Sequence, residues 1–425
     1  MVAGVVAALH VGKLPPALPV LGQVLGVSLL QAGFLLSLVQ LAGMTLGLVT
    51  GLAVQRVGLR RSMVSGLLVL ASASALGGSA PDVYWLLASR VLEGLGFLWV
   101  VLPAPGLVRR LVPQERLSGM MGAWGAYMPL GAALALLAGP QVINWVAPDW
   151  GWRILWWVLA ALAAVLAVLV AWRVPADERA PPWPSGQVAA RPSNRELIAT
   201  TLRSPAAWLM AMAFAMYSGQ WLAVVGFLPS IYAQAGVGGS WVAWLTALAA
   251  AVNILGNVTA GRLLGRGVPP LVLLGTGFLA MGGGTLLAFA PHVSPKLQYA
   301  AVLAFSMVGG LIPATLFSLA IRLAPSADTV STTVGWIQQW SALGQFAGPP
   351  LVAWVAASAG SWQWTGWVTA VSSGVGLLLA VLLHRLHGSA SPFAGATRKQ
   401  ALARDKGACR SCACENAIER LHAAA

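Results

Sequence analysis

Residues 51–61 read Gly-Leu-Ala-Val-Gln-Arg-Val-Gly-Leu-Arg-Arg and lie between two apolar stretches of helical length. Residues 261–267 read Gly-Arg-Leu-Leu-Gly-Arg-Gly and lie between two other apolar stretches. Glycine permits tight turns and positive φ, and arginine beside such a turn can bind helix C-terminal carbonyls and anionic headgroups. Two similar basic turns in different halves of the chain indicate an internal repeat.

Basic residues are concentrated in alternate connections of the chain. Of the 25 Lys and Arg residues, 21 lie in every second loop or in the C-terminal tail, whereas the intervening loops carry only Arg153 and Lys296. Membrane proteins keep an excess of Lys and Arg in their cytoplasmic loops. The pattern therefore predicts a multi-pass protein of the inner membrane with both termini in the cytoplasm. The remaining two, Lys13 and Arg90, lie inside apolar stretches.

The composition agrees with a membrane protein. Hydrophobic residues make up 58% of the chain and charged residues 8%, and the net charge of +14 is spread over loops rather than gathered on a soluble module, so no nucleic-acid partner is expected. The first stretch holds His10, Lys13 and three prolines, and we interpret it as a retained span rather than a signal peptide. Because a helix needs ~20 residues to cross the bilayer core, we predict twelve spans at residues 2–21, 32–54, 62–79, 84–107, 120–139, 154–172, 207–233, 241–264, 269–290, 298–321, 332–357 and 364–383.

The long polar, proline-rich segment 173–206 divides the predicted spans six and six. Such a division suggests the two halves of a transporter repeat. We therefore expect an all-α integral membrane fold with an N-terminal six-helix bundle (1–172), a cytoplasmic linker (173–206), a C-terminal six-helix bundle (207–383) and a cytoplasmic tail (384–425).

Four short motifs occur in order along the first half of the chain. Residues 51–61 resemble the signature loop of the major facilitator superfamily, Gly-x-x-x-Asp-Arg-x-Gly-x-Arg-Arg, with Gln55 in the acidic position. Residues 90–94 resemble its fourth-span motif, with Glu in place of Gln. Residues 125–131 are similar to its fifth-span Gly/Pro motif, and residues 151–153 to the Gly-Trp-Arg that opens its sixth span. The resemblance extends over essentially residues 1–385 and implies twelve transmembrane helices in two pseudo-symmetric six-helix bundles.

A narrower resemblance is to the cyanate/nitroimidazole permease subfamily. It lies in residues 105–110, 227–232 and 309–313. That subfamily often has an arginine early in the first span, where this chain offers His10 and Lys13. The resemblance implies a small-molecule substrate and no cofactor.

Three charged residues lie deep within predicted spans: Lys13, Arg90 and Glu93. A charge at the centre of a lone membrane helix costs ~2.5–3.5 kcal/mol, so charges kept there tend to face a cavity or a partner. Arg90 and Glu93 are three residues apart and can pair on one helix face. Either they form an internal ion pair that locks the helix, or Arg90 attracts an anionic substrate and Glu93 tunes it or carries a coupled proton.

The first span is interrupted by Pro15, Pro16 and Pro19. Prolines free backbone groups that a membrane protein tolerates only against protein or water, so we expect the span to bend around a central cavity. Lys13 then either contacts an anion in that cavity or extends to the membrane surface. His10, one turn earlier, is either a packing residue or a further site residue.

The C-terminal half has neutral polar residues, and no charged ones, deep in its spans. They bind either the substrate or neighbouring helices. The candidates for substrate binding are Tyr217, Gln220, Asn253, Trp336, Gln338 and Gln339.

The turn at residues 51–61 lies far from the membrane midplane. We therefore expect it to control conformational switching rather than recognition. Its switch residues are Gly51, Gln55, Arg56, Gly58, Arg60 and Arg61.

Most of the 20 Trp lie near span ends, and we interpret them, Trp152 and Trp156 included, as an interfacial belt. The tail contains Cys409, Cys412 and Cys414. These thiols either remain reduced bystanders or bind a soft metal, and no metal site is predicted.

The sequence thus favours a secondary transporter, monomeric, that moves a small anionic solute by alternating access with a proton as the candidate coupling ion. The alternatives are a drug or metabolite efflux antiporter, and a membrane sensor or enzyme. A nucleotide-binding loop of the form G-x-x-x-x-G-K-[ST] does not occur in the sequence, which argues against ATP-driven transport.

Overall fold

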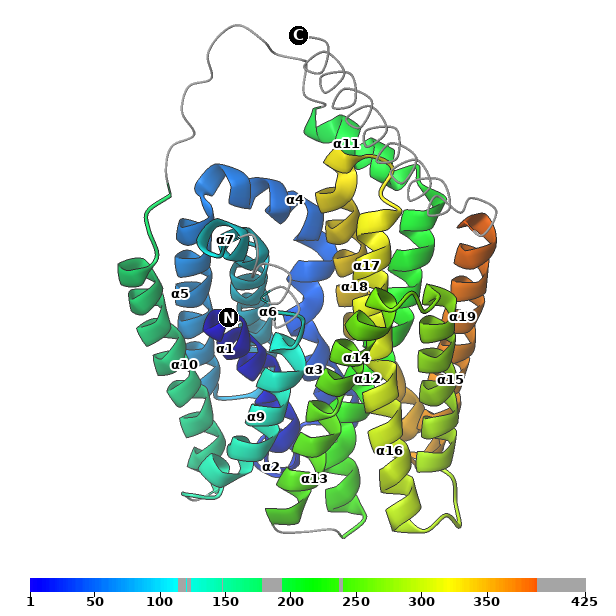
Figure 1. Ribbon diagram of the computed structural model, residues 1–425. Helices are drawn as coiled ribbons and strands as arrows, with labels where there is room; N and C mark the ends of the chain where they lie inside the picture. Colours follow the sequence, from blue (N-terminus) through cyan, green and yellow to red (C-terminus); the bar gives the residue numbers. More distant parts are fainter. Residues whose placement is uncertain (114–119, 121–123, 147, 178–192, 237–239, 388–425) are drawn as a thin grey trace, which may run out of the picture. The chain divides into compact units, whose positions relative to one another are not determined.

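The computed structural model describes the chain except residues 114–119, 121–123, 147, 178–192, 237–239 and 388–425, and all regular structure in the described part is helical (Figure 1). Met1–Ala380 forms one compact unit and Val381–Ala425 a second. Helices suit a membrane because each one satisfies its backbone hydrogen bonds internally. The predicted all-α membrane fold is confirmed.

The helices that precede the linker come from the first 173 residues. They are α1 (Val2–Gly12), α2 (Leu14–Val24), α3 (Leu29–Ser37), the 3₁₀ helix η1 (Leu38–Gln40), α4 (Leu41–Val57), α5 (Leu59–Gly78), α6 (Val83–Val101), α7 (Ala104–Leu111), α9 (Tyr127–Ile143) and α10 (Pro148–Arg173).

The helices of the linker and the C-terminal half follow. They are α11 (Asn194–Leu202), α12 (Pro205–Gln234), α13 (Ser240–Ala251), α14 (Asn253–Gly265), α15 (Pro270–Ala288), α16 (Pro295–Gly309), α17 (Leu311–Arg322), the 3₁₀ helix η2 (Ala327–Thr329), α18 (Val330–Ala359) and α19 (Gln363–His387).

Ten helical stretches in the described residues are long and apolar enough to cross a bilayer. The other two predicted spans are also helical: α9 has 17 residues, and α18 has 30 residues but carries several Gln, Ser and Thr side chains. The protein is therefore a multi-pass membrane protein. Its division into two six-helix bundles stays a prediction.

Two details differ from the sequence-based prediction. The fifth span was placed at 120–139, but α9 continues to Ile143, because the apolar run alone does not show where the helix ends. The linker was assigned no secondary structure from the sequence, but it contains α11, which begins with a capping box between Ser193 and Glu196. A short polar helix of this kind has no hydropathy signal.

The first span is interrupted at Lys13, as its prolines predicted. α1 ends at Gly12 and α2 begins at Leu14, with Pro15 and Pro16 in the first turn of α2. Prolines lack the backbone N–H that would continue the hydrogen bonds of α1. The break places Lys13 at the junction of the two helices.

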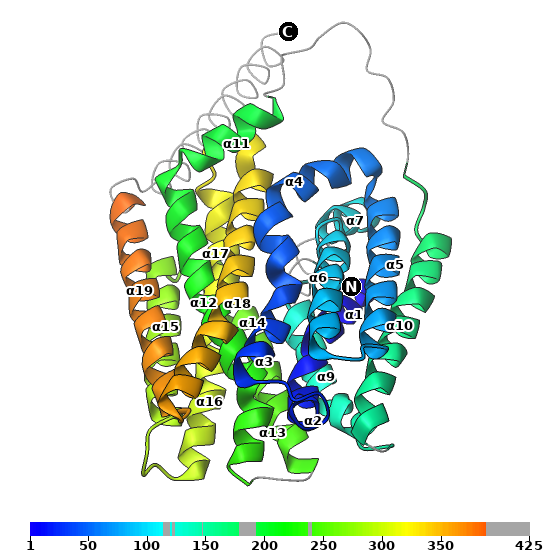
Figure 2. The same ribbon diagram turned by 180° about the vertical axis from the view of Figure 1, so that it is seen from behind.

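The second span packs along α18. Figure 2 shows α3 and α4 between α6 on one side and α12 and α18 on the other. A Cβ added to Gly33 would lie 2.8 Å from Pro350 Cα, and one added to Gly43 would lie 2.9 Å from Ala342 Cβ. Glycine at these positions lets the two helices approach closely. α2 also contacts α12, and α9 contacts α13.

Candidate functional site

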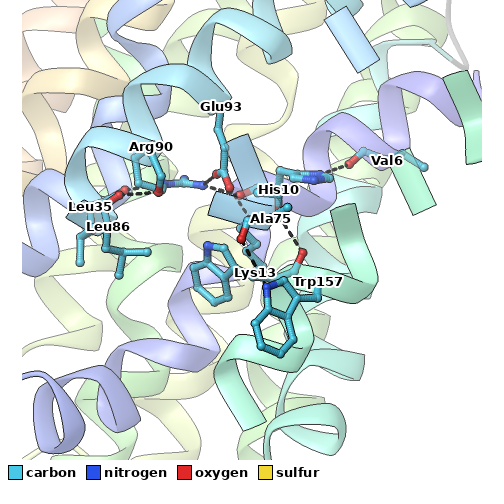
Figure 3. Close-up of polar contacts among 12 residues, drawn as sticks. Val6, His10, Lys13, Leu35, Ala75, Leu86, Arg90, Glu93 and Trp157 are labelled. Atoms are coloured by element: carbon cyan, nitrogen blue, oxygen red, sulfur yellow. Dashed lines mark hydrogen bonds and ion pairs between the residues drawn. The ribbon is translucent and has the colours of Figure 1, made fainter. Parts of the chain in front are cut away.

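The three predicted membrane charges meet in one place, which we call the charge cluster (Lys13, Arg90 and Glu93; Figure 3). Lys13 Nζ lies 2.6 Å from Glu93 Oε1, and Arg90 Nη1 forms an ion pair with Glu93 Oε2. None of the three side chains has exposed surface. The pairing of Arg90 with Glu93 follows from their positions one turn apart on α6. Lys13 is 80 positions from Glu93 and reaches it from the break between α1 and α2.

Lys13 has two further partners on the neighbouring helices α5 and α10. Its ammonium donates to Ser74 Oγ at 2.8 Å, and Ser74 Oγ donates in turn to Trp156 O at 2.8 Å. The Lys13 Nζ atom also lies 4.5 Å from the centroid of the Trp156 ring. Lys13 therefore does not extend to the membrane surface, because its charge is held inside the protein.

Arg90 is bound by main-chain carbonyls of two other helices. Its Nε donates to Leu35 O at 3.1 Å and its Nη1 to His10 O at 2.8 Å. Its Nη2 has no hydrogen-bond partner among the described residues. His10 is also fully buried, with Nδ1 2.9 Å from Val6 O and Nε2 unpartnered within the described part of the chain.

The charge cluster is internally paired, but its formal charges do not cancel. Lys13 and Arg90 formally bring two positive charges, and Glu93 brings one negative charge. Buried charges are costly unless paired and hydrogen bonded, and here Glu93 serves both cations. The cluster thus joins α1 and the α1–α2 junction to α3, α5, α6 and α10 and retains a formal excess of positive charge.

The residues around the cluster correct one prediction. Trp152 and Trp156 were assigned to the interfacial belt, but both have 0% exposed surface. Their rings pack edge to face with centroids 5.6 Å apart. Their sequence positions near the start of the sixth span do not show which face of α10 they occupy. Ser74 and Trp156 were also missed as partners of Lys13, because neither carries a charge that would mark it.

Two of the neutral candidates of the C-terminal half, Tyr217 and Asn253, belong to a separate network between α12, α14 and α16. Asn253 Nδ2 donates to Tyr217 OH at 3.0 Å and to Ser306 O at 2.8 Å. Asn257 Nδ2 donates to Asn253 Oδ1 at 3.0 Å. Trp221 Nε1 donates to Ser306 Oγ at 3.1 Å. The structure therefore brings Tyr217 and Asn253 together as helix-bridging groups.

The other neutral candidates lie apart from this network. Gln220 accepts a hydrogen bond from Ser373 at 2.9 Å. Trp336 packs against the rings of Trp208 and Trp340, with centroids 4.8 Å and 5.9 Å away. Gln338 is half-buried.

Gln339 binds the main chain of α4. Its Nε2 donates to Met44 O at 2.8 Å, and its Oε1 accepts from Leu48 N at 3.2 Å.

The basic turn, residues 51–61, has a carboxylate partner from beyond α10. Arg60 N and Arg61 N each donate to Asp177 at 3.0 Å, and Arg110 Nη1 lies 3.3 Å from Asp177 Oδ1. Partial burial raises the pKa of Asp177, but these two N–H groups and the charges of Arg110 and Arg61 outweigh it, so the pKa lies below its ordinary value. Asp177 thus brings a carboxylate to a turn that has Gln55 in the acidic position of the family motif.

Gly58 is required by this arrangement. Its φ is +103°, and a Cβ at this position would collide with the Asp177 carboxylate. Gly51, Gln55 and Arg56 lie on the last turns of α4, and their side chains are outside the described residues. Asp177 was missed by sequence reasoning because the linker was treated only as a boundary.

The three tail cysteines Cys409, Cys412 and Cys414 also lie outside the described residues. Within the described residues, no group of three His, Cys, Asp or Glu side chains is placed to hold a metal ion.

Comparison with known proteins gives one family. The chain matches the Major Facilitator Superfamily over residues 1–349. It is similar to the cyanate transport protein of Escherichia coli K12, with 28% identity over 236 residues that cover 55% of this chain and 57% of the relative. That match therefore spans little more than half the relative's length. The 2-nitroimidazole transporter of the same organism is 25% identical over 354 residues, 82% of this chain and 84% of the relative.

Two further matches extend the range of relatives. A chloramphenicol resistance protein of Streptomyces lividans is 29% identical over 326 residues, 73% of this chain and 78% of the relative. Among solved structures, a bacterial homolog of the human lysosomal transporter Spinster, inward-facing and occupied, has a TM-score of 0.74 at 14% identity. That match covers 90% of this chain and 95% of the other chain and shows a common fold.

Proposed function

The chain belongs to the Major Facilitator Superfamily, and from this premise we propose that it is a secondary transporter that moves a small anionic solute by alternating access. The observation that carries the proposal is the charge cluster, which is buried and holds two cations for one carboxylate. An anion entering beside it would offset the excess positive charge. Charges inside membrane spans commonly mark substrate or ion pathways.

Arg90 is the group that we expect to bind the anion. Its Nη2 is a buried donor without a partner among the described residues. A guanidinium presents its donors in a plane and can bind a carboxylate at two points, which an ammonium cannot do. Because Lys13 and Arg90 are fully buried, the anion reaches them only after a rearrangement, and alternating access supplies one.

The neutral network of Tyr217 and Asn253 is the proposed contact for the uncharged part of the substrate. Both side chains are buried and share hydrogen bonds that a ligand could replace. The transport cycle would then close the C-terminal half over an anion bound to the N-terminal half.

Glu93 is the candidate carrier of a coupling proton. It is the carboxylate of the charge cluster and contacts both cations. Glu93→Gln separates two roles for it. If Glu93 carries the proton, the variant should lose gradient-driven uptake and keep substrate exchange. If Glu93 is a structural partner of Arg90, the variant should lose expression or both activities.

A drug or metabolite efflux antiporter is the second candidate function. The similarity to a chloramphenicol resistance protein favours it. A membrane enzyme or sensor is a weaker alternative. Among the described spans, Glu93 is the one fully buried carboxylate, and His10 is the one histidine near it, so a catalytic set of several His, Asp or Glu side chains is not seen there.

We further propose that the protein lies in the inner membrane as a monomer, with both termini and the linker in the cytoplasm and with bundles at 1–172 and 207–383. The alternation of basic loops supports this orientation.

Counter-flow in proteoliposomes tests the transport function. The panel of solutes contains cyanate and an aromatic carboxylate as anions and 2-nitroimidazole as a near-neutral solute. Vesicles loaded with an unlabelled anion should accumulate the same anion, labelled, from outside without ATP. The variant Lys13→Gln/Arg90→Gln should lose this activity, whereas Lys296→Gln, which changes an exposed lysine, should keep it. Wild-type anion flux in the double variant, or flux of neutral drugs alone, would overturn the anionic assignment.

A further inference from the structure

Gln339 of α18 contacts a single turn of α4 through both ends of its amide. Its Nε2 donates to Met44 O at 2.8 Å, and its Oε1 accepts from Leu48 N at 3.2 Å. Met44 O and Leu48 N are four residues apart, which is the spacing of the backbone hydrogen bond in an α-helix. The amide therefore binds the donor and the acceptor of one helical turn at once.

The surface of α4 is shaped to receive this side chain. A Cβ added to Gly47 would lie 3.3 Å from Gln339 Cβ and 3.4 Å from its Oε1. One turn earlier, a Cβ added to Gly43 would lie 2.9 Å from Ala342 Cβ. Larger residues at these two positions would hold α18 away from the α4 main chain.

The contact joins two parts of the chain that are far apart in sequence. Gln339 is 295 positions from Met44. A second hydrogen bond between the same two parts of the chain lies just before α4, where Gln40 Nε2, at the end of η1, donates to Gln345 Oε1 of α18 at 3.1 Å. Leu48 lies three residues before Gly51, the first residue of the basic turn, which is about 4.5 Å along the helix axis at 1.5 Å per residue.

We propose that Gln339 is not a substrate ligand but a latch that holds α18 against α4 at the end of the membrane near the basic turn. Both hydrogen-bonding ends of its amide are already occupied by the α4 main chain. In alternating access the two halves rock against each other, so this contact has to open in one of the two states. Breaking the latch therefore shifts the balance between the states and leaves substrate contacts unchanged.

A cysteine pair across the latch measures this balance without any substrate. A Cβ at Gly335 would lie 3.4 Å from Leu48 Cδ2, so Leu48→Cys and Gly335→Cys face each other. In a background with the three tail cysteines replaced by serine, a short bifunctional thiol reagent should link this pair in membranes. Gln339→Ala should lower the initial rate of cross-linking about five- to tenfold, the factor expected for two interhelical side-chain bonds of ordinary strength.

Gln339→Glu sharpens the test. An ionised carboxylate has no donor for Met44 O and should reduce cross-linking as alanine does. A protonated carboxyl has one donor and one acceptor, like the amide, so acidic pH should restore cross-linking in this variant but not in Gln339→Ala. Gln338→Ala, on the next residue of α18, is the matched control and should cross-link like the parent.

The latch rests on the proposed alternating access, but its test can fail independently of it. Unchanged cross-linking in both Gln339 variants, with monodisperse purified protein, would overturn the latch and leave the transport function standing. A loss of equilibrium substrate binding in Gln339→Ala equal to that in Arg90→Gln would also overturn it, because Gln339 would then be a ligand. If the protein moves no solute at all, the proposed function fails even where the cross-linking result holds.

Discussion

Glu93 is expected to be the most sensitive member of the charge cluster. Glu93→Gln keeps the size of the side chain but leaves Lys13 and Arg90 buried with no negative partner. Removing one partner of a buried ion pair typically costs about 3–5 kcal/mol, because the other charge remains desolvated. Lys13→Met loses two hydrogen bonds, to Glu93 and Ser74, but leaves Arg90 paired with Glu93 and removes the excess charge, so its cost should be about 1–3 kcal/mol. We therefore expect Glu93→Gln to destabilise the protein more than Lys13→Met, by about 2 kcal/mol at the centres of these ranges.

SDS titration of the purified protein in mixed micelles gives the two free energies of unfolding. Lys296→Met, a change of the same type at an exposed position, serves as control and should match the wild type. If Lys13→Met proves as destabilising as Glu93→Gln, then Glu93 does not compensate the charges of both Lys13 and Arg90, and the reasoning from the excess positive charge is wrong.

Three further predictions concern the basic turn, the topology and the cluster as a whole. Asp177→Asn should slow transport with substrate binding nearly intact. Because the pKa of Asp177 is lowered in the folded state, its stabilisation is complete above the unfolded value of about 4 and is lost below it, so the difference in thermal midpoint between wild type and variant should shrink from pH 7 to about pH 3. Cysteines at Ser185 and Ser361 should react with an impermeant maleimide from opposite sides of the membrane once the tail cysteines are removed, and same-side labelling would contradict the twelve-span topology. A triple variant replaces the whole cluster by apolar residues: Lys13→Met, Arg90→Met and Glu93→Leu. It should still fold, measured by monodispersity, and should lose counter-flow, whereas retained counter-flow would mean that the cluster has only a structural role.

The fold could be predicted from the sequence because a bilayer imposes strong constraints. An apolar helix must reach across the hydrocarbon core, and basic loops alternate in a simple order. The break at Lys13 was likewise predictable, since Pro15 and Pro16 cannot donate backbone hydrogen bonds. The end of α9 at Ile143, four residues beyond the predicted span, was not, because the helix boundary depends on packing.

The candidate site was predictable only where the contacts are local. Arg90 and Glu93 are one helical turn apart, and their pairing follows from that spacing. Lys13 meets Glu93, Gln339 meets Met44 and Asp177 meets Arg60 across many intervening residues. One sequence carries no signal for such pairings, since they are fixed by helix packing. Trp156 shows the same limit, because a tryptophan near a span end can face lipid or the interior.

The distribution of charged and neutral contacts fits the cycle that we propose. In the described part of the chain, the partners of the charge cluster come from helices before the linker: Ser74 on α5, Trp156 on α10, and the carbonyls of His10 and Leu35 on α1 and α3. Rocking of the two halves would therefore leave every one of these bonds intact. The contacts that would open include those of α18 with η1 and α4. Among the described residues, the hydrogen bonds there are made by the neutral amides of Gln40, Gln339 and Gln345. Separating neutral amides costs much less than separating buried charges, so a protein that opens and closes at this interface can keep its ion pairs in one half and its reversible bonds between halves.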